Sequence, residues 1–184
     1  MTRVREIISV SARRRYTAIK EKMAPVRWST KNEIRQMLTE EKYNTLLQSI
    51  LMVHTQPALS QLNAIKQSLP KQARQFEIGI HPGQDGEGFF DVVVHLDGPD
   101  LYVLNKAIQP YRVLFSVKCI DGRMQPDVPM FDPGETLFCV NDVIVDVCMT
   151  WVEKLWSQSG GVGLPGYVFG EEGYGTISRK PLLP

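Results

Sequence analysis

Apolar residues in the first part of the chain recur every three or four positions, which is the spacing of an amphipathic α-helix. The first such stripe stops at Pro25, and Thr30 with Glu33 forms a capping-box pattern that starts the next helix. A further helix begins near Pro57, where proline fits the first turn. The clearest helical stripe consists of Tyr43, Leu46, Leu47, Ile50 and Leu51. We therefore expect residues 1–72 to be helical.

The periodicity then changes from helical to alternating. Residues 76–80 and 89–96 alternate between apolar and polar side chains, and the turn-forming segment 82–88 separates them. Two alternating runs around a Gly-rich turn predict an antiparallel hairpin.

Beyond the hairpin, the pattern changes from one element type to the next. It predicts a short helix over 101–108, a third strand over 111–119, an irregular loop over 121–135 and a short strand over 137–140. Asn141 is expected to cap a final helix. The Gly-rich remainder carries only isolated apolar anchors.

This order of elements indicates an α+β fold. We expect N-terminal helices packed with a small antiparallel sheet, formed by the hairpin, a crossover helix and a third strand, and a C-terminal helix. The length of 184 residues suits a single domain with a sizeable core. We accordingly expect one domain over 1–184, with a helical half at 1–72 and a sheet-containing half at 73–184.

Charge is distributed unevenly between the two halves. Residues 1–75 hold 14 Lys/Arg and 5 Asp/Glu, whereas residues 76–184 hold 7 Lys/Arg and 15 Asp/Glu. Two interpretations stay open: the halves attract each other within one fold, or the acidic half meets a charged partner. Arg13, Arg14 and Arg15 could contact phosphates, but no nucleic-acid-binding module accompanies them, so we expect a solvated basic helix face and no nucleic-acid partner.

The cysteines and the N-terminus point to a cytoplasmic location. Cys119, Cys139 and Cys148 lie in apolar stretches without CxxC spacing, which predicts reduced, buried thiols. No signal-peptide core and no membrane-spanning run is present in the sequence, so we expect no membrane association.

The hairpin offers the one face with candidate chemistry. An imidazole near carboxylates can act as a general base or a metal ligand, although alternation alone also predicts a solvent-exposed face. The two histidines are expected at opposite ends of the hairpin, which argues against zinc. Gly161 to Gly166 matches GxGxxG but follows a helix and contains Pro165, so we expect no dinucleotide and no other cofactor or metal. The residues of this face are Glu77, His81, Phe89, Asp91, Val93 and His95.

Two segments, FFDVVVHLDGPDLYVLNKAI and VFGEEGYGTISRKPLL, resemble an uncharacterised family of small bacterial domains. The resemblance covers residues 76–184 and implies no catalytic residues. In size and architecture the chain is also similar to immunity proteins of bacterial toxin systems, which are small, cytoplasmic, non-enzymatic α+β domains with charged binding faces.

Our leading hypothesis is a non-enzymatic cytoplasmic protein-binding domain, in the manner of an immunity protein that neutralises a basic toxin domain. The alternatives are an enzyme of unrecognised class that uses His81, Asp91 and His95, and a structural or oligomerisation domain. Because binding residues concentrate on loops, we expect the partner surface on the acidic loops of the second half. Its candidate residues are Asp85, Glu87, Asp97, Asp100, Asp127, Asp132, Glu135, Glu171 and Glu172.

Overall fold

The computed structural model describes residues 38–183. The predicted first helix, the capping box at Thr30 and Glu33, and the arginines of 13–15 lie outside the described residues.

Two helices open the described part, as the apolar spacing predicts. Helix α3 spans Glu40–Val53, and the hydroxyl of Thr39 accepts a hydrogen bond from the amide of Lys42 at its N-terminus. Helix α4 follows at Thr55–Gln67 after a break at His54. The side chains on their inner faces are fully buried, among them Tyr43, Leu47, Leu51, Ala58, Leu62 and Ile65.

The sheet is larger than the sequence predicts. Strands β1 (Gln75–Pro82) and β2 (Phe90–Asp97) form the predicted antiparallel hairpin. Strand β6 (Gly166–Gly170) pairs parallel to β1, and β7 (Arg179–Leu182) pairs antiparallel to β6. The strand order β3-β2-β1-β6-β7 makes a mixed five-stranded sheet in place of the small antiparallel sheet that we expected.

The predicted third strand is divided in two. Helix α5 (Leu101–Ile108) crosses to β3 (Val113–Ser116), which pairs with β2 through a β-bulge. The chain then leaves the sheet, and β4 (Lys118–Ile120) forms a separate small hairpin with β5 (Arg123–Gln125). The expected irregular loop over 121–135 thus begins with a turn and a strand.

The last helix, α6 (Val140–Ser159), begins two residues earlier than predicted. Its N-cap is Cys139, not Asn141, and no strand forms over 137–140. Asn141 is buried in the first turn, where its amide nitrogen donates to the carbonyl of Gly83 at 2.8 Å. The chain does not end on this helix, because β6 and β7 follow it.

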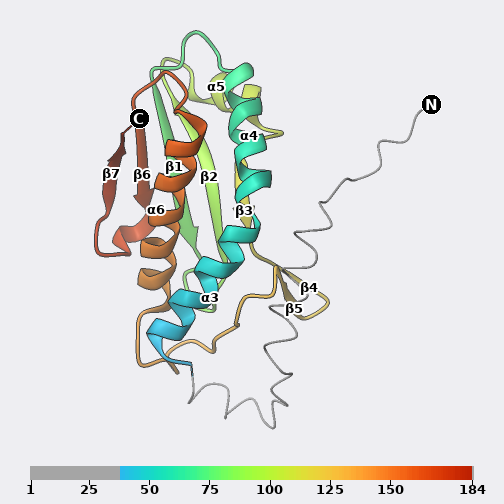
Figure 1. The fold of residues 1–184 in the computed structure, drawn as a ribbon, viewed down its shortest axis with the longest axis vertical. Helices are drawn as coiled ribbons and strands as arrows, with labels where there is room; N and C mark the ends of the chain where they lie inside the picture. Colours follow the sequence, from blue (N-terminus) through green and yellow to red (C-terminus); the bar gives the residue numbers. More distant parts are fainter. Residues whose placement is uncertain (1–37, 184) are drawn as a thin grey trace, which may run out of the picture. The chain divides into compact units, whose positions relative to one another are not determined.

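Helices α3, α4 and α6 cover one face of the sheet (Figure 1). Strand residues that point toward the helices are fully buried, for example Ile78, Val92 and Val94, whereas the alternate positions remain partly exposed. The indole nitrogen of Trp151 in α6 donates to the hydroxyl of Thr55 in α4 at 3.1 Å. Helices and sheet therefore share one core within the described residues.

The thiols differ from the prediction that all three are buried. Cys148 is fully buried in α6, but Cys119 and Cys139 are exposed. The reason is local: Cys119 lies on the small β4–β5 hairpin outside the main sheet, and Cys139 lies at the start of α6.

Candidate functional site

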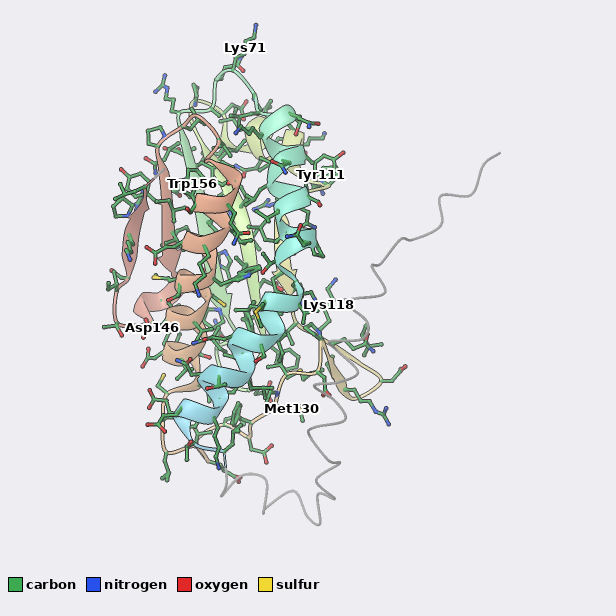
Figure 2. The ribbon with its side chains drawn as sticks, viewed as in Figure 1. Lys71, Tyr111, Lys118, Met130, Asp146 and Trp156 are labelled. Carbon is green, nitrogen blue, oxygen red and sulfur yellow. The ribbon has the colours of Figure 1, made fainter. Side chains whose placement is uncertain are left out.

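Several loops meet at the end of the sheet that carries the β1–β2 turn, residues 83–89. We call this the hairpin end. The amide of Phe131 donates to the carbonyl of Glu87 at 3.0 Å, which places the segment 126–139 against the turn. Strand β6 runs parallel to β1, so the turn η1 (Glu171–Gly173) follows it at the same end. Figure 2 shows Met130 toward this end and Lys71 at the opposite one.

The structure gathers most of the predicted acidic residues at the hairpin end. Asp85 and Glu87 lie in the β1–β2 turn, and Glu171 and Glu172 lie in η1. Asp132 and Glu135 belong to the part of the segment 126–139 that lies near the turn, whereas Asp127 directly follows the β4–β5 hairpin. Within residues 38–183, no ion pair or side-chain hydrogen bond engages the carboxylates of Asp85, Glu87, Asp127 or Glu172.

The other two predicted residues lie elsewhere. Asp97 and Asp100 follow β2 at the opposite end of the sheet, and each has a local structural role. One carboxylate oxygen of Asp97 accepts from the amide of Gly98 at 2.9 Å, and Asp100 caps α5 by accepting from the amide of Val103 at 3.1 Å. The prediction therefore joined residues that belong to two different surfaces.

A shallow cavity and exposed apolar side chains accompany the carboxylates of the hairpin end. The cavity measures about 180 Å³ and is bounded by the β1–β2 turn, the segment 126–139, the start of α6 and Tyr174. Beside it, the side chain of Leu137 is fully exposed (106%) and that of Met130 is half exposed (49%). Apolar anchors with a charged rim are a common composition of protein–protein interfaces.

A second cluster lies on the face of the sheet that the helices leave uncovered. The Nε2 atoms of His81 and His95 are 3.1 Å apart, and the two rings meet edge to face. Our prediction that these histidines lie at opposite ends of the hairpin was wrong. Asp91 lies on the same face, as expected, directly across the strands from His81, but within residues 38–183 it makes no hydrogen bond to either ring.

Two features bring the histidines together. The strand register pairs Glu77 with His95 and His81 with Asp91, because the connecting loop is 83–89 and not 82–88. Gly79 lies between them on the same face, and a Cβ there would stand 2.4 Å from Nε2 of His81. The missing side chain leaves space for the His81 ring to lie along the strand and reach His95.

The outer nitrogens of the two rings are also engaged. A guanidinium nitrogen of Arg112 donates to Nδ1 of His95 at 2.9 Å, since arginine has donors only. Neutral His95 therefore carries its proton on Nε2 and donates it to Nε2 of His81. His81 in turn carries its proton on Nδ1 and donates it to a carboxylate oxygen of Glu171 at 2.6 Å. We call Arg112, His95, His81 and Glu171 the histidine relay.

The pKa of the His95 ring is strongly lowered. Burial, the neighbouring Arg112 charge and His81 together lower the pKa of His95 from 6.5 to about 4, with Glu171 opposing. Phe169 from β6 flanks both imidazoles, with its ring centroid 6.0 Å from that of His81 and 6.3 Å from that of His95. Sequence analysis missed Arg112, Gly79 and Phe169, although a glycine inside a strand is a signal of close approach.

The bonding of the relay does not favour catalysis or metal binding in its present form. A carboxylate on Nδ1 orients an imidazole as it does in general-base catalysis, but the nitrogen that would face a substrate accepts from His95. A metal on Nε2 of His95 would have to replace the proton that the Arg112 contact keeps there. Within the described residues, no group of three or more His, Cys, Asp or Glu is arranged to hold a metal ion.

The fold and the sites define an α+β domain with a mixed sheet, a histidine relay on its open face and an acidic end. Residues 38–182 match the model of the family described as "Family of unknown function (DUF6389)". Because the match spans most of the 184 residues, the chain belongs to this family. The match extends the expected resemblance over 76–184 to include α3 and α4. No curated protein and no solved structure matches the chain.

Among residues 38–183, none of the helices combines the length and the apolar character that crossing a bilayer requires.

Proposed function

We propose that this chain is a non-enzymatic protein-binding domain whose hairpin end binds a basic protein partner. The proposal is carried by three acidic segments that lie at one end of the sheet, next to a cavity lined by Asp85, by residues within 134–141 and by Tyr174, which directly follows η1. Asp85 and Glu87 come from the β1–β2 turn, Glu172 from η1 and Glu135 from the segment before α6. Like charges brought together by folding cost stability, and a partner of opposite charge offsets that repulsion.

The exposed apolar side chains add a second reason for a protein partner. Leu137 stands fully in solvent beside the acidic residues, although burying a leucine contributes about 1.5–3 kcal/mol. A basic protein with an apolar pocket would cover Leu137 and Met130 and would face the carboxylates with its lysines and arginines. Electrostatic complementarity of this kind accelerates association and fixes orientation.

The role that best fits such a surface is that of an immunity protein in the cytoplasm of a bacterium. An enzyme that handles nucleic acid needs a basic cleft, and an acidic domain that covers the cleft blocks it. The two alternatives, an enzyme using His81, Asp91 and His95 and an oligomerisation domain, are less well supported, because neither accounts for the acidic end.

The test is retention of a partner from the native host at low ionic strength, using the full chain as bait. The first variant combines Asp85→Asn, Glu87→Gln and Glu172→Gln, and leaves Glu171 and the histidine relay intact. The matched control combines Asp97→Asn and Asp100→Asn, which removes charge at the opposite end while asparagine keeps the cap and turn bonds.

We expect the wild type and the control to retain the same basic protein, and the first variant to retain about tenfold less. A third bait, Arg13→Gln with Arg14→Gln and Arg15→Gln, tests whether the partner binds through the basic residues instead. Equal retention by the first variant would contradict the proposal, and so would loss of retention with the third bait alone.

A further inference from the structure

We propose that His81 and His95 form a proton-operated latch between β1 and β2, which is closed while both rings are neutral and opens when the pair takes up one proton. This inference does not depend on the proposed function. It rests on the chain of donors and acceptors from Arg112 to Glu171.

The closed state uses every nitrogen of the two rings. His95 receives a hydrogen bond on Nδ1 and donates from Nε2, and His81 receives on Nε2 and donates from Nδ1. The two imidazoles thus hold two protons, and the arrangement has one direction only, because the guanidinium of Arg112 can donate but not accept.

Each ring has one basic nitrogen, and in the closed state both accept a hydrogen bond: Nδ1 of His95 from Arg112 and Nε2 of His81 from His95. The proton from solvent goes to Nε2 of His81, because a proton on Nδ1 of His95 would face the positive charge of Arg112. Both Nε2 atoms then carry hydrogens that point at each other across 3.1 Å, and the bond between the rings is lost. The charged His81 ring keeps its contact with Glu171, which becomes an ion pair, and moves away from His95 and from the Arg112 charge.

The surroundings favour this direction of movement. Phe169 flanks the pair and offers no hydrogen bond to a freed ring. Glu77 is engaged by Arg179 at 2.7 Å, so it does not compete for the new charge. The charged and titratable groups that face the pair are Glu77 of β1, Asp91 of β2, Arg112 before β3, Tyr167 of β6, Glu171 and Glu172 of η1, and Arg179 of β7.

Opening the latch has a defined structural consequence. The rings connect β2 to β1 and, through Glu171, to η1, so their separation removes the side-chain connection between β2 and η1 and keeps the one between β1 and η1. If the hairpin end binds a basic partner as proposed above, the ion pair also neutralises one carboxylate of that surface.

The experiment is nitrogen NMR of the imidazoles in the full chain, followed from pH 8 to pH 4. At neutral pH we expect the Nδ1–H tautomer for His81 and the Nε2–H tautomer for His95. As the pair takes up one proton, the ring signals of His81 and His95 should change together, because the hydrogen bond that joins the rings is lost.

Two variants and one control distinguish the latch from two histidines that are near each other without a directed hydrogen bond. Gly79→Ala changes no titratable group but places a methyl group where the His81 ring lies, so the His95 signals should stop following His81. Gly83→Ala is the control, because the nearest atom to its Cβ lies at an ordinary 3.4 Å, and it should titrate like the wild type. Arg112→Met removes the donor to His95 and should raise the His95 midpoint by about one pH unit.

Three results would overturn the latch. The first is the same tautomer on both rings of the wild type at neutral pH. The second is a His95 response that persists unchanged in Gly79→Ala and Arg112→Met. The third is stoichiometric uptake of added Zn²⁺ with loss of the His95 Nε2–H signal, which would make the pair a metal site.

Discussion

The rings of Tyr43 and Phe131 meet edge to face, with their centroids 4.9 Å apart. This contact attaches the segment 126–139, which carries part of the acidic surface, to helix α3. Phe138 from the same segment lies 5.9 Å from Tyr43. The position of the acidic loops therefore depends on a buried aromatic cluster.

Replacing Tyr43 by phenylalanine should stabilise the protein. The side chain is fully buried, and its hydroxyl has no hydrogen-bond partner within the described residues. Removing that oxygen keeps the ring contacts and should raise the free energy of unfolding by about 1 kcal/mol in urea denaturation. Tyr43→Leu, which loses the ring contacts with Phe131, should lower it by about 2–3 kcal/mol. A lower stability for Tyr43→Phe than for wild type would mean that the hydroxyl has a partner.

Asp146 holds the chain after η1 on helix α6. Its carboxylate accepts from the amide of Thr176 at 2.8 Å and from its hydroxyl at 2.6 Å. Asp146→Ala should increase the hydrogen-exchange rate of the Thr176 amide and lower stability by about 1–2 kcal/mol. Asp146→Asn keeps one acceptor oxygen, so its exchange rate and its stability should lie between those of the wild type and of Asp146→Ala. Exchange at Thr176 that is unchanged in Asp146→Ala would show that the segment is held by other contacts.

The three thiols should differ in reactivity. Cys119 and Cys139 are exposed, whereas Cys148 is buried in α6, and burial raises the pKa of its thiol. Alkylation of the folded protein near pH 8 should modify Cys119 and Cys139 but not Cys148, which should react only in denaturant. Mass spectrometry of the peptides measures this directly, and modification of Cys148 at the rate of the other two would place it outside the core.

Stability should fall as the pH drops from about 6.5 to about 4. The pKa of His95 is held at about 4 in the folded chain, so in this window the unfolded chain binds the proton and the folded chain does not. Because His95 is partly exposed, we expect a contribution of about 1–2 kcal/mol. His95→Gln should reduce the loss of stability in this window. Parallel pH curves for the variant and the wild type in chemical denaturation would contradict this expectation.

Local patterns predicted the elements that local contacts make. The stripe containing Tyr43 and Leu47 and the alternation around Val92 correspond to α3 and β2. The β4–β5 hairpin also has a local signal in the sequence: Asp121-Gly122 is a typical two-residue turn, and both residues have positive φ angles, 53° and 73°. A turn at Asp121-Gly122 indicates that the end of the expected third strand, 111–119, belongs to a second hairpin.

The parts of the fold that the sequence patterns did not predict depend on pairings between residues far apart in the chain. Strand β6 is five residues long and includes two glycines, and β7 contains Pro181, so neither shows a strand pattern. Both form because β6 pairs parallel to β1, about ninety residues earlier in the chain. The histidine relay likewise joins Arg112 and Glu171 to the hairpin, and no local pattern relates residues so far apart. The sequence identified the acidic loops, but it did not show that Asp97 and Asp100 lie at the end of the sheet opposite the hairpin end.

The most direct test of the proposed function is the association rate of the purified partner, measured against ionic strength. The wild type and the Asp97→Asn/Asp100→Asn control should associate at the same rate. The variant with Asp85→Asn, Glu87→Gln and Glu172→Gln should associate about tenfold more slowly at low salt, and the difference should shrink at high salt as screening takes over. Equal association rates for the variant and the wild type at every salt concentration would contradict binding through the acidic hairpin end.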